Sequence, residues 1–318
     1  MKGTVIAMPD DVRVVKLEGV QKFNRISIPA NVLFSGVFII LAFACFMPLL
    51  FVTIISFSSD TSIQKIGYSL RPLEWTTYAY EYLLNSRSSI LDAFKVSVGV
   101  TVVGTVFGVI MNASMGYVLS RPAFKLRKFY TMIVFIPMLF NGGLVASYMI
   151  NSQLLQLTNS YWILILPLAV SSFYIIILRT FFQTTIPDSI IESAKIDGAS
   201  QLRTFFRIVL PISLPALATI GLFLSFAYWN DWFMAMLYIK SDHTHMYPLQ
   251  YVLINIERNM DFLLRNTEFF SASMSGGRIP AESVRMALVV IVVVPIACSY
   301  PFFQKYFVSG LTIGAVKG

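Results

Sequence analysis

An unbroken run of 50 residues without a charged side chain constrains this protein more than any other sequence feature. The run covers residues 129–178, and as a single α-helix it would be about 75 Å long at 1.5 Å per residue. The hydrocarbon core of a bilayer is about 30 Å thick and is crossed by about 20 apolar residues. The run is therefore too long for one crossing, and we expect the chain to turn within the polar stretch NSQLLQLTNS at residues 151–160.

The composition of the whole chain agrees with this expectation. Hydrophobic residues make up 56% of the 318 residues and charged residues 13%, whereas a soluble domain carries about 25% charged residues. We therefore predict an all-α integral membrane protein with six transmembrane helices. The uncharged run supplies the third and fourth, and the others are expected near 31–57, within 96–120, from about 208 to 230 and over 286–304.

Six helices place both termini on the same side of the membrane. With the turn RPAFKLRK (residues 121–128) and the segment 179–211, that side carries 15 of the 24 lysine and arginine residues but six of the 16 acids. Because cytoplasmic loops are enriched in Lys and Arg, we predict that both termini are cytoplasmic. The net charge of +8 then follows from membrane topology, and no nucleic-acid partner is expected.

This topology divides the chain into three parts. Residues 1–28 are expected to be a cytoplasmic N-terminal segment, residues 29–307 a membrane domain, and residues 308–318 a cytoplasmic tail. The predicted location is a cell membrane, which the chain crosses several times. Residues 240–283 are expected to form an exposed outer loop.

A polar insert, IPDSIIESAKIDGASQLRTFFRIVLP (residues 186–211), separates the fourth and fifth apolar runs. Ser189 and Glu192 have the S-x-x-E spacing of a capping box that starts a helix. Asp197–Gly198 would end this helix, with Gly198 in the left-handed conformation. Ser200 would cap a second short helix, whose apolar residues lie on or near one side: Leu202, Phe205, Phe206 and Val209. An ordinary amphipathic connector is the alternative, although a connector needs no tight glycine turn between capped helices.

The insert resembles the EAA loop of ABC importer permeases, whose form is roughly E-A-A-x-x-x-G, nine residues, then I-x-L-P. Ser193 replaces the first alanine of that pattern. The matching positions are Glu192, Ser193, Ala194, Asp197, Gly198, Ala199, Ile208, Leu210 and Pro211. The stretches AYWNDWFMAMLYI (227–239), QKYFVSGLTIGAVKG (304–318) and NASMGYVLSRPAFKLRK (112–128) resemble the carbohydrate-uptake, MalG-like branch, and most of all LplC/YtcP-type oligosaccharide permeases.

The resemblance implies a type I ABC importer permease (MetI-like) fold and a location in a bacterial cytoplasmic membrane. It also implies a transport subunit that is not an enzyme. A dimer of cytoplasmic ABC ATPase would bind ATP and Mg and seat the insert in a groove, through the charge of Glu192 and the close backbone approach at Gly198. This chain has no G-x-x-x-x-G-K-[ST] phosphate loop, and no cofactor of its own is expected. A second homologous permease would share the translocation path, and an extracytoplasmic solute-binding protein would meet the outer loop. The tail residues implied to contact the ATPase are Gly310, Leu311, Thr312 and Gly314.

Residues after the fifth apolar run are candidates for the substrate path: Tyr228, Trp229, Asn230, Asp231 and Trp232. The rings of Tyr228, Trp229 and Trp232 would stack on sugars or, alternatively, form an interfacial aromatic belt. Asp231 is either a path residue or a solvated helix end. His243 and His245 have no cysteine nearby, so no metal site is expected there. Residues 141–143 (Asn-Gly-Gly) interrupt the third helix. They are expected to kink it against a neighbouring helix; the alternative is that the freed backbone groups line a cavity.

The resemblance implies import of oligosaccharides across the lipid bilayer, and two other functions stay open. A permease for amino acids, phosphate or peptide-like solutes would share the insert, but the carbohydrate-type tail and the WNDW segment argue against it. An ion-coupled secondary transporter predicts charged residues in mid-membrane and internal repeats, and the chain shows neither clearly. An intramembrane enzyme is disfavoured because no catalytic constellation lies within the predicted spans.

Overall fold

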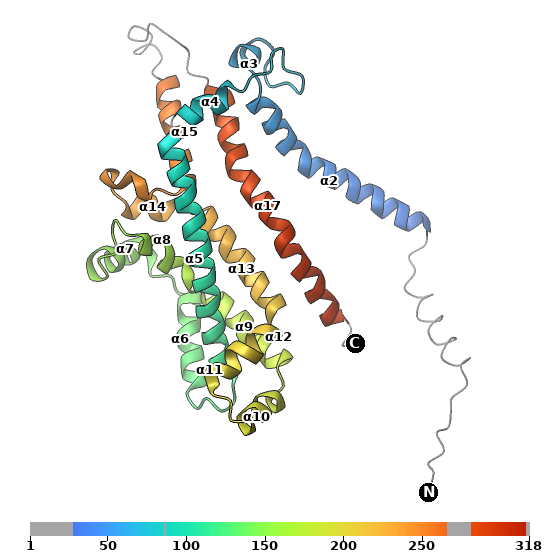
Figure 1. The fold of residues 1–318 in the computed structure, drawn as a ribbon, viewed down its shortest axis with the longest axis vertical. Coiled ribbons are helices and arrows are strands. Elements are labelled where there is room, and N and C mark those ends of the chain that lie inside the picture. Colours follow the sequence, from blue (N-terminus) through green and yellow to red (C-terminus); the bar gives the residue numbers. More distant parts are fainter. Residues whose placement is uncertain (1–27, 86, 266–280, 316–318) are drawn as a thin grey trace. The chain divides into compact units, whose positions relative to one another are not determined.

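The structure is a computed structural model that describes residues 28–85, 87–265 and 281–315 (Figure 1). All the longer elements within these residues are helices, and the extended backbone pairs only in an isolated bridge between Ser58 and Trp75. The chain divides into two compact units, Met1–Ile54 and Ile55–Gly318. Each unit is described by itself.

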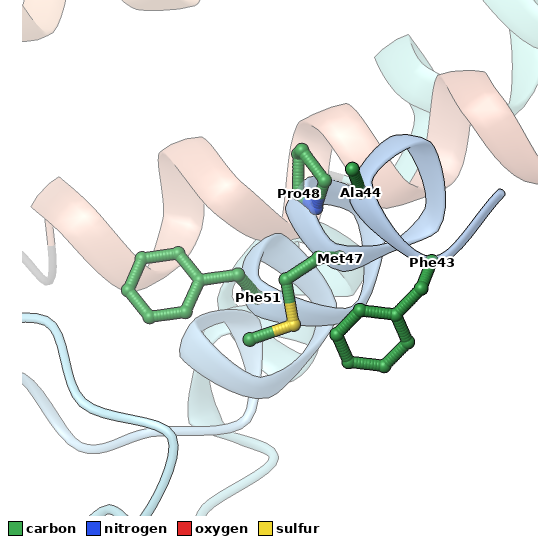
Figure 2. A pocket seen from close by; sticks show the side chains of 5 residues that line it. All are labelled: Phe43, Ala44, Met47, Pro48 and Phe51. Carbon is green, nitrogen blue, oxygen red and sulfur yellow. The ribbon is translucent and has the colours of Figure 1, made fainter. Parts of the chain in front are cut away.

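The described part of the first unit is helix α2 (Ile28–Ser56), which continues two residues into the second. It contains no charged residue, so every face of the helix is apolar, as expected for a membrane span. Pro48 lies inside the helix and has no N–H to donate to the carbonyl of Ala44. Together with Phe43, Met47 and Phe51 these two residues line a shallow hollow on the helix surface (Figure 2).

The second unit contains the remaining helices. In chain order they are α3 (Asp60–Ile66), α4 (Tyr78–Asn85), α5 (Arg87–Ser120), α6 (Arg127–Leu139), α7 (Gly143–Met149), the π-helical turn η1 (Ile150–Leu154), α8 (Tyr161–Ala169), α9 (Ser172–Thr185), α10 (Asp188–Ile196), α11 (Gln201–Thr204), the π-helical turn η2 (Phe205–Val209), α12 (Leu210–Ile212), α13 (Leu214–Trp229), α14 (Phe233–Tyr238), the 3-10 helix η3 (Ser241–Met246), α15 (Leu249–Arg265) and α17 (Ala281–Ala315).

Three helices of the described chain are long and apolar enough to cross a membrane: α2, α5 over Ile90–Ser120 and α17 over Glu282–Ser299. Three bent pairs raise this number to six if each pair is one span. The bends are 118° between α6 and α7–η1, 49° between α8 and α9, and 84° between α11–α12 and α13. The predicted all-α membrane fold is confirmed, and the segments expected as the third, fourth and fifth spans are bent pairs of helices rather than single straight ones.

Helix α5 is the element around which the second unit packs, with α8, α9 and α13 against it (Figure 1). Two glycines of α5 let these neighbours approach. A Cβ at Gly104 would lie 2.5 Å from Cζ of Tyr228, and a Cβ at Gly108 would lie 2.9 Å from the carbonyl oxygen of Ala169. Small residues permit this close packing between membrane helices.

The break between α8 and α9 is closed by the fully buried Asn112 of α5. Its Nδ2 donates to the carbonyl oxygens of Gly108 at 2.6 Å and Ala169 at 2.7 Å, and its Oδ1 accepts from the N–H of Ser171 at 3.0 Å. A helix can break inside a membrane only where protein or enclosed water satisfies the freed backbone groups. Here one side chain satisfies a carbonyl and an N–H on the two sides of the break.

The predicted kink at residues 141–143 is wrong in kind, because a bend of 118° turns the chain back on itself. Gly143 has a φ of +82°, and its N–H donates to Oδ1 of Asn141 at 2.8 Å. Glycine adopts this left-handed conformation without a steric penalty. The segment is therefore either a broken span or a re-entrant loop, with its first part in α6 and its second part in α7 and η1.

The predicted outer loop contains regular structure that the sequence interpretation left out. Within residues 240–283 lie η3 and the 17-residue helix α15, whereas residues 266–280 fall outside the described chain. Leu249 and Val252 of α15 are buried.

The predicted N-terminal segment lies outside the described residues except for Ile28, the first residue of α2.

Candidate functional site: the insert between α9 and α13

The first helix of the insert, α10, begins two residues earlier than the predicted capping box allows. Pro187 is its N-cap, with φ −59° and ψ 142°, and no side chain caps the helix. The prediction that Ser189 and Glu192 form a capping box is therefore wrong. The extended backbone of Pro187 starts the helix at Asp188, whose carboxylate is favourable in the first turn because helix N-termini carry partial positive charge.

The end of α10 is formed as predicted. Gly198 has a φ of +73°; its N–H donates to the carbonyl of Lys195 at 3.0 Å, and the N–H of Ala199 donates to the carbonyl of Ala194 at 2.9 Å. These two bonds form a Schellman motif. No atom lies within 4 Å of the position that a Cβ at Gly198 would take. Backbone conformation, not crowding within this chain, is the reason for glycine here.

The second helix of the insert is capped by Ser200, also as predicted. Its Oγ accepts from the N–H of Arg203 at 3.3 Å. Residues four apart share a stripe on a helix, so Leu202 with Phe206 and Phe205 with Val209 form two adjacent stripes, which agrees with the predicted position on or near one side. The two stripes differ in burial: Leu202 is 71% and Phe206 51% exposed, whereas Phe205 and Val209 are buried.

The insert presents an exposed surface, which we call the insert surface. Ile191 and Ala194 are buried and fix α10 to the rest of the unit. We define it by these exposed residues: Glu192, Ser193, Lys195, Ile196, Asp197, Gly198, Leu202 and Phe206. Ile196 is 85% exposed, and its apolar side chain stands beside the charged residues of α10. Of the other predicted contact residues, Pro211 is exposed, whereas Ala199, Ile208 and Leu210 are half-buried.

The junction between α13 and α14 holds the predicted substrate-path residues. The ring of Tyr228 is buried against Gly104, and its hydroxyl donates to the carbonyl of Ile165 at 2.7 Å. Trp229 is also buried; its Nε1 donates to the carbonyl of Val292 at 3.3 Å, and its ring meets Phe94 edge to face with centroids 6.1 Å apart. In this conformation both rings pack within the protein, which leaves little ring face for a sugar.

The other three residues of the junction are more accessible. Asn230 is exposed, and its Nδ2 donates to the carbonyl of Phe226. Asp231 is half-buried, and its Oδ1 accepts from the N–H groups of Phe233 at 3.2 Å and Met234 at 3.4 Å. Burial raises the pKa of this carboxyl, and the two hydrogen bonds lower it in part. The guanidinium of Arg258 lies 6.0 Å from the ring centroid of Trp232.

A groove between α5, α13 and α17 is a feature that sequence reasoning missed. Its volume is about 460 Å³, and Trp229 lies at its wall. The walls are mostly apolar, with hydroxyls contributed by Thr101, Thr105, Ser225 and Ser299. The hydroxyls of Thr101 and Thr105 have no hydrogen-bond partner among the described residues. The four-residue spacing of these threonines in an apolar run was the available signal.

The predicted tail residues lie in a helix. Helix α17 continues to Ala315, so its last turns contain Gly310, Leu311, Thr312 and Gly314. Of the predicted tail, residues 316–318 fall outside the described chain. In η3, Nδ1 of His243 lies 2.8 Å from Oδ1 of Asp242. Within the described ranges no group of three or more His, Cys, Asp and Glu side chains is placed to hold a metal.

Comparisons with known proteins point in one direction. The family model described as "Binding-protein-dependent transport system inner membrane component" matches residues 104–313. The chain is 37% identical over 289 residues to the polygalacturonan/rhamnogalacturonan transport system permease protein YtcP of Bacillus subtilis, covering 91% of this chain and 98% of the relative. It is 35% identical over 297 residues to protein LplC of the same organism, covering 93% and 97%.

A solved structure gives the same result for the fold. The structure described as a bacterial ABC transporter involved in the import of the acidic polysaccharide alginate matches with a TM-score of 0.74 and 26% sequence identity. The match covers 95% of this chain and all of that one. The helices of the second unit, with their breaks, therefore follow the fold of an ABC importer permease.

Proposed function

Because the chain belongs to the family of binding-protein-dependent transport system inner membrane components, we propose that it is the permease subunit of an ABC importer that takes up oligosaccharides. It is a transport subunit and not an enzyme. The observation that carries the proposal is 37% identity to a polygalacturonan/rhamnogalacturonan permease over 91% of the chain. Family members work with an ATPase and a solute-binding protein, and both are proposed partners here.

The insert surface is the proposed contact with the ATPase. Leu202, Ile196 and Phe206 expose apolar side chains next to the charges of α10, and exposed apolar patches rimmed by polar residues mark interaction sites. Glu192 would meet the ATPase through its charge. Gly198 leaves open space at the turn, so the backbone of the partner can approach closely. Closure of an ATP-bound ATPase dimer would move the insert and drive an alternating-access transition.

The membrane orientation proposed for the chain follows its basic residues. The insert and both termini are cytoplasmic in this proposal, since that side carries most of the Lys and Arg side chains. The solute-binding protein would meet the opposite face, at the segment with η3 and α15. ATP and Mg would be bound by the ATPase, with no cofactor in this chain, and the last turns of α17 would contact that ATPase.

The translocation path is proposed to lie between this subunit and a second homologous permease. The groove between α5, α13 and α17 supports a contribution from this chain because its hydroxyls stand among apolar walls. Asn230, Asp231 and Trp232 are the more accessible candidates at the α13–α14 junction. Tyr228 and Trp229 stay path predictions that a different conformation would have to expose.

The proposal is tested with the complex purified from its native membrane. We expect a second permease, an ATPase and a solute-binding protein to co-purify, and calorimetry of the binding protein to show binding of oligogalacturonides or neutral oligosaccharides. Uptake of the bound sugar into vesicles should require ATP. Uptake by the lone chain driven by an ion gradient would favour a secondary transporter, and binding of amino acids or phosphate instead of sugars would favour the non-sugar importer.

A further inference from the structure

Arg121, the first residue after α5, is held by four neighbours at the end of the helix. Its Nη1 donates to Oδ1 of Asp188 at 3.1 Å, its Nη2 to the carbonyl of Phe182 at 2.9 Å, and its Nε to Oγ of Ser120 at 2.9 Å. Its guanidinium carbon lies 5.3 Å from the ring centroid of Tyr117. The side chain is 12% exposed, whereas that of its ion-pair partner Asp188 is 58% exposed.

These contacts join three separate elements. Ser120 and Tyr117 belong to α5, Phe182 lies near the end of α9, and Asp188 is the first residue of α10. The guanidinium of arginine is planar, so its N–H donors point in fixed directions. A lysine ammonium cannot donate to the same three acceptors in this geometry. Arginine at this position therefore ties the start of the insert to α5 and α9 at the same time.

The other end of the insert is attached to the same place. The ring of Tyr117 packs on Phe205 of η2 at a tilt of 35°, with centroids 5.3 Å apart, and meets Phe182 edge to face at 6.1 Å. The start of α10 and the turn after α11 are therefore both fastened to the last two turns of α5. Between them is a hollow of about 330 Å³ whose charged and amide lining is Arg121, Asp188, Glu192, Lys195 and Gln201.

We infer that Arg121 is a positioning residue that makes the insert move with α5. This inference rests on the proposed role of the insert as the ATPase contact. A displacement of α10 would be carried into α5 through Asp188 and Tyr117, and from α5 into α8, α9 and α13, which pack directly on it. The ion pair with Asp188 alone contributes little free energy because that carboxylate is largely exposed. The attachment depends on the fixed geometry of all the contacts of Arg121 together.

The test uses the complete importer reconstituted with its ATPase and binding protein. Uptake and ATP hydrolysis are measured together for Arg121→Lys, Arg121→Ala and Asp188→Asn. We expect the number of sugars taken up per ATP to fall between about 2-fold and about 30-fold in Arg121→Ala, the range for residues that carry coupling between sites. Arg121→Lys and Asp188→Asn should fall less, because each keeps part of the attachment.

A distance measurement separates attachment from a general structural role. Spin labels at Lys195→Cys and Lys125→Cys, in a chain with Cys45→Ser and Cys298→Ser, report the separation of α10 from the connector after α5. We expect the distance distribution to broaden in Arg121→Ala and to stay narrow in the control Arg179→Lys, whose native Nε reaches the carbonyl of Leu119 and not the insert. Assembly with the ATPase is checked by co-purification; if Arg121→Ala does not assemble, Asp188→Asn and Arg121→Lys decide the result.

The possible outcomes are distinct. Unchanged uptake per ATP together with a narrow distance distribution in the Arg121 and Asp188 variants would overturn the inference. If Glu192→Gln and Gly198→Val also leave uptake per ATP unchanged, the insert is not the ATPase contact and the proposed function of the insert fails as well. If those two variants uncouple transport while the Arg121 variants do not, only the role of Arg121 is disproved.

Discussion

The insert and the α13–α14 junction each interrupt apolar helices, and each depends on a glycine, but the two glycines have opposite surroundings. At Gly198, in the insert, no atom lies within 4 Å of the position of a Cβ, and the backbone has a φ of +73°. At Gly104, which faces the junction, the backbone is helical and the Tyr228 ring would lie 2.5 Å from a Cβ. The insert needs glycine for a backbone conformation, and the junction needs it for space.

This difference reflects which forces determine each region. The insert is formed by local interactions. Pro187 starts its first helix, Gly198 ends that helix in a turn, and Ser200 caps the second helix by accepting from the N–H of Arg203. The junction is formed by tertiary packing, because the hydroxyl of Tyr228 and the indole of Trp229 bond to carbonyls of α8 and α17. Changes in the insert should therefore affect coupling, and changes at the junction should affect stability.

The largest effect is expected from Gly104→Ala. The added methyl would overlap the buried Tyr228 ring, and such overpacking costs about 1–3 kcal/mol. The control on the same helix is Gly99→Ala, where no atom lies within 4 Å and alanine gains up to about 1 kcal/mol of helix propensity. Thermal unfolding in detergent should show a lower Tm for the first variant and an equal or higher Tm for the second. Equal Tm values for both would contradict the packing described at the junction.

A smaller effect on stability and a large one on coupling are expected from Gly198→Val. A side chain in the left-handed conformation costs about 1–2 kcal/mol, so the turn should rearrange while the membrane domain keeps its Tm. The matched variant is Gly198→Asn, because asparagine tolerates this conformation. We expect uptake per ATP to be lower in Gly198→Val than in Gly198→Asn. A loss of Tm as large as that of Gly104→Ala would mean that Gly198 is packed in the assembled protein.

The smallest effect is expected from Asp231→Asn at the junction. Burial raises the pKa of Asp231 above its ordinary value of 3.8, so the folded state favours the protonated carboxyl. The stability from this group is fully present below pH 3.8 and is lost as pH rises through the raised pKa. Asparagine keeps the Oδ1 acceptor and carries no charge. At neutral pH the variant should be as stable as the native chain or slightly more so, and the difference should shrink toward pH 3.8.

Asp242→Asn provides a control of opposite sign. The pKa of Asp242 is lowered, chiefly by its hydrogen bond with His243, so its contribution to stability is present above its ordinary pKa and is lost as pH falls. At neutral pH this variant should be equally stable or slightly less stable than the native chain. The same pH dependence of Tm in both variants would show that burial at Asp231 does not govern its titration.

The two regions also differ in how much of them was predictable from sequence. The turn at Gly198 and the cap at Ser200 were predicted correctly because each depends on residues within a few positions. The start of α10 was predicted incorrectly. Pro187 is the N-cap and Asp188 the first helical residue, so Ser189 lies inside the helix and does not cap it. The burial of Tyr228 and Trp229 was beyond local reasoning, since their partners lie on α5, α8 and α17, far away in the sequence.

The length of the spans was more readable from sequence than their breaks. Charge-free length predicted six spans, a number that the described chain reaches if each bent pair is one span. It also predicted a turn near residues 151–160, and η1 ends at Leu154 before α8 begins at Tyr161. The helix α15 was missed because its charged residues made it unlike a span, although Leu249, Val252, Leu253 and Ile256 have helical spacing. Asn112 was not recognised because nothing near it in sequence shows that α8 breaks opposite its amide.

Asn112 has a consequence for how the break between α8 and α9 is held. A break in a membrane helix frees backbone groups that need a partner from protein or enclosed water. Here one amide bonds the carbonyl of Ala169 and the N–H of Ser171, and it also bonds the carbonyl of Gly108 in its own helix. The break is thereby attached to α5, a helix other than the two that meet there.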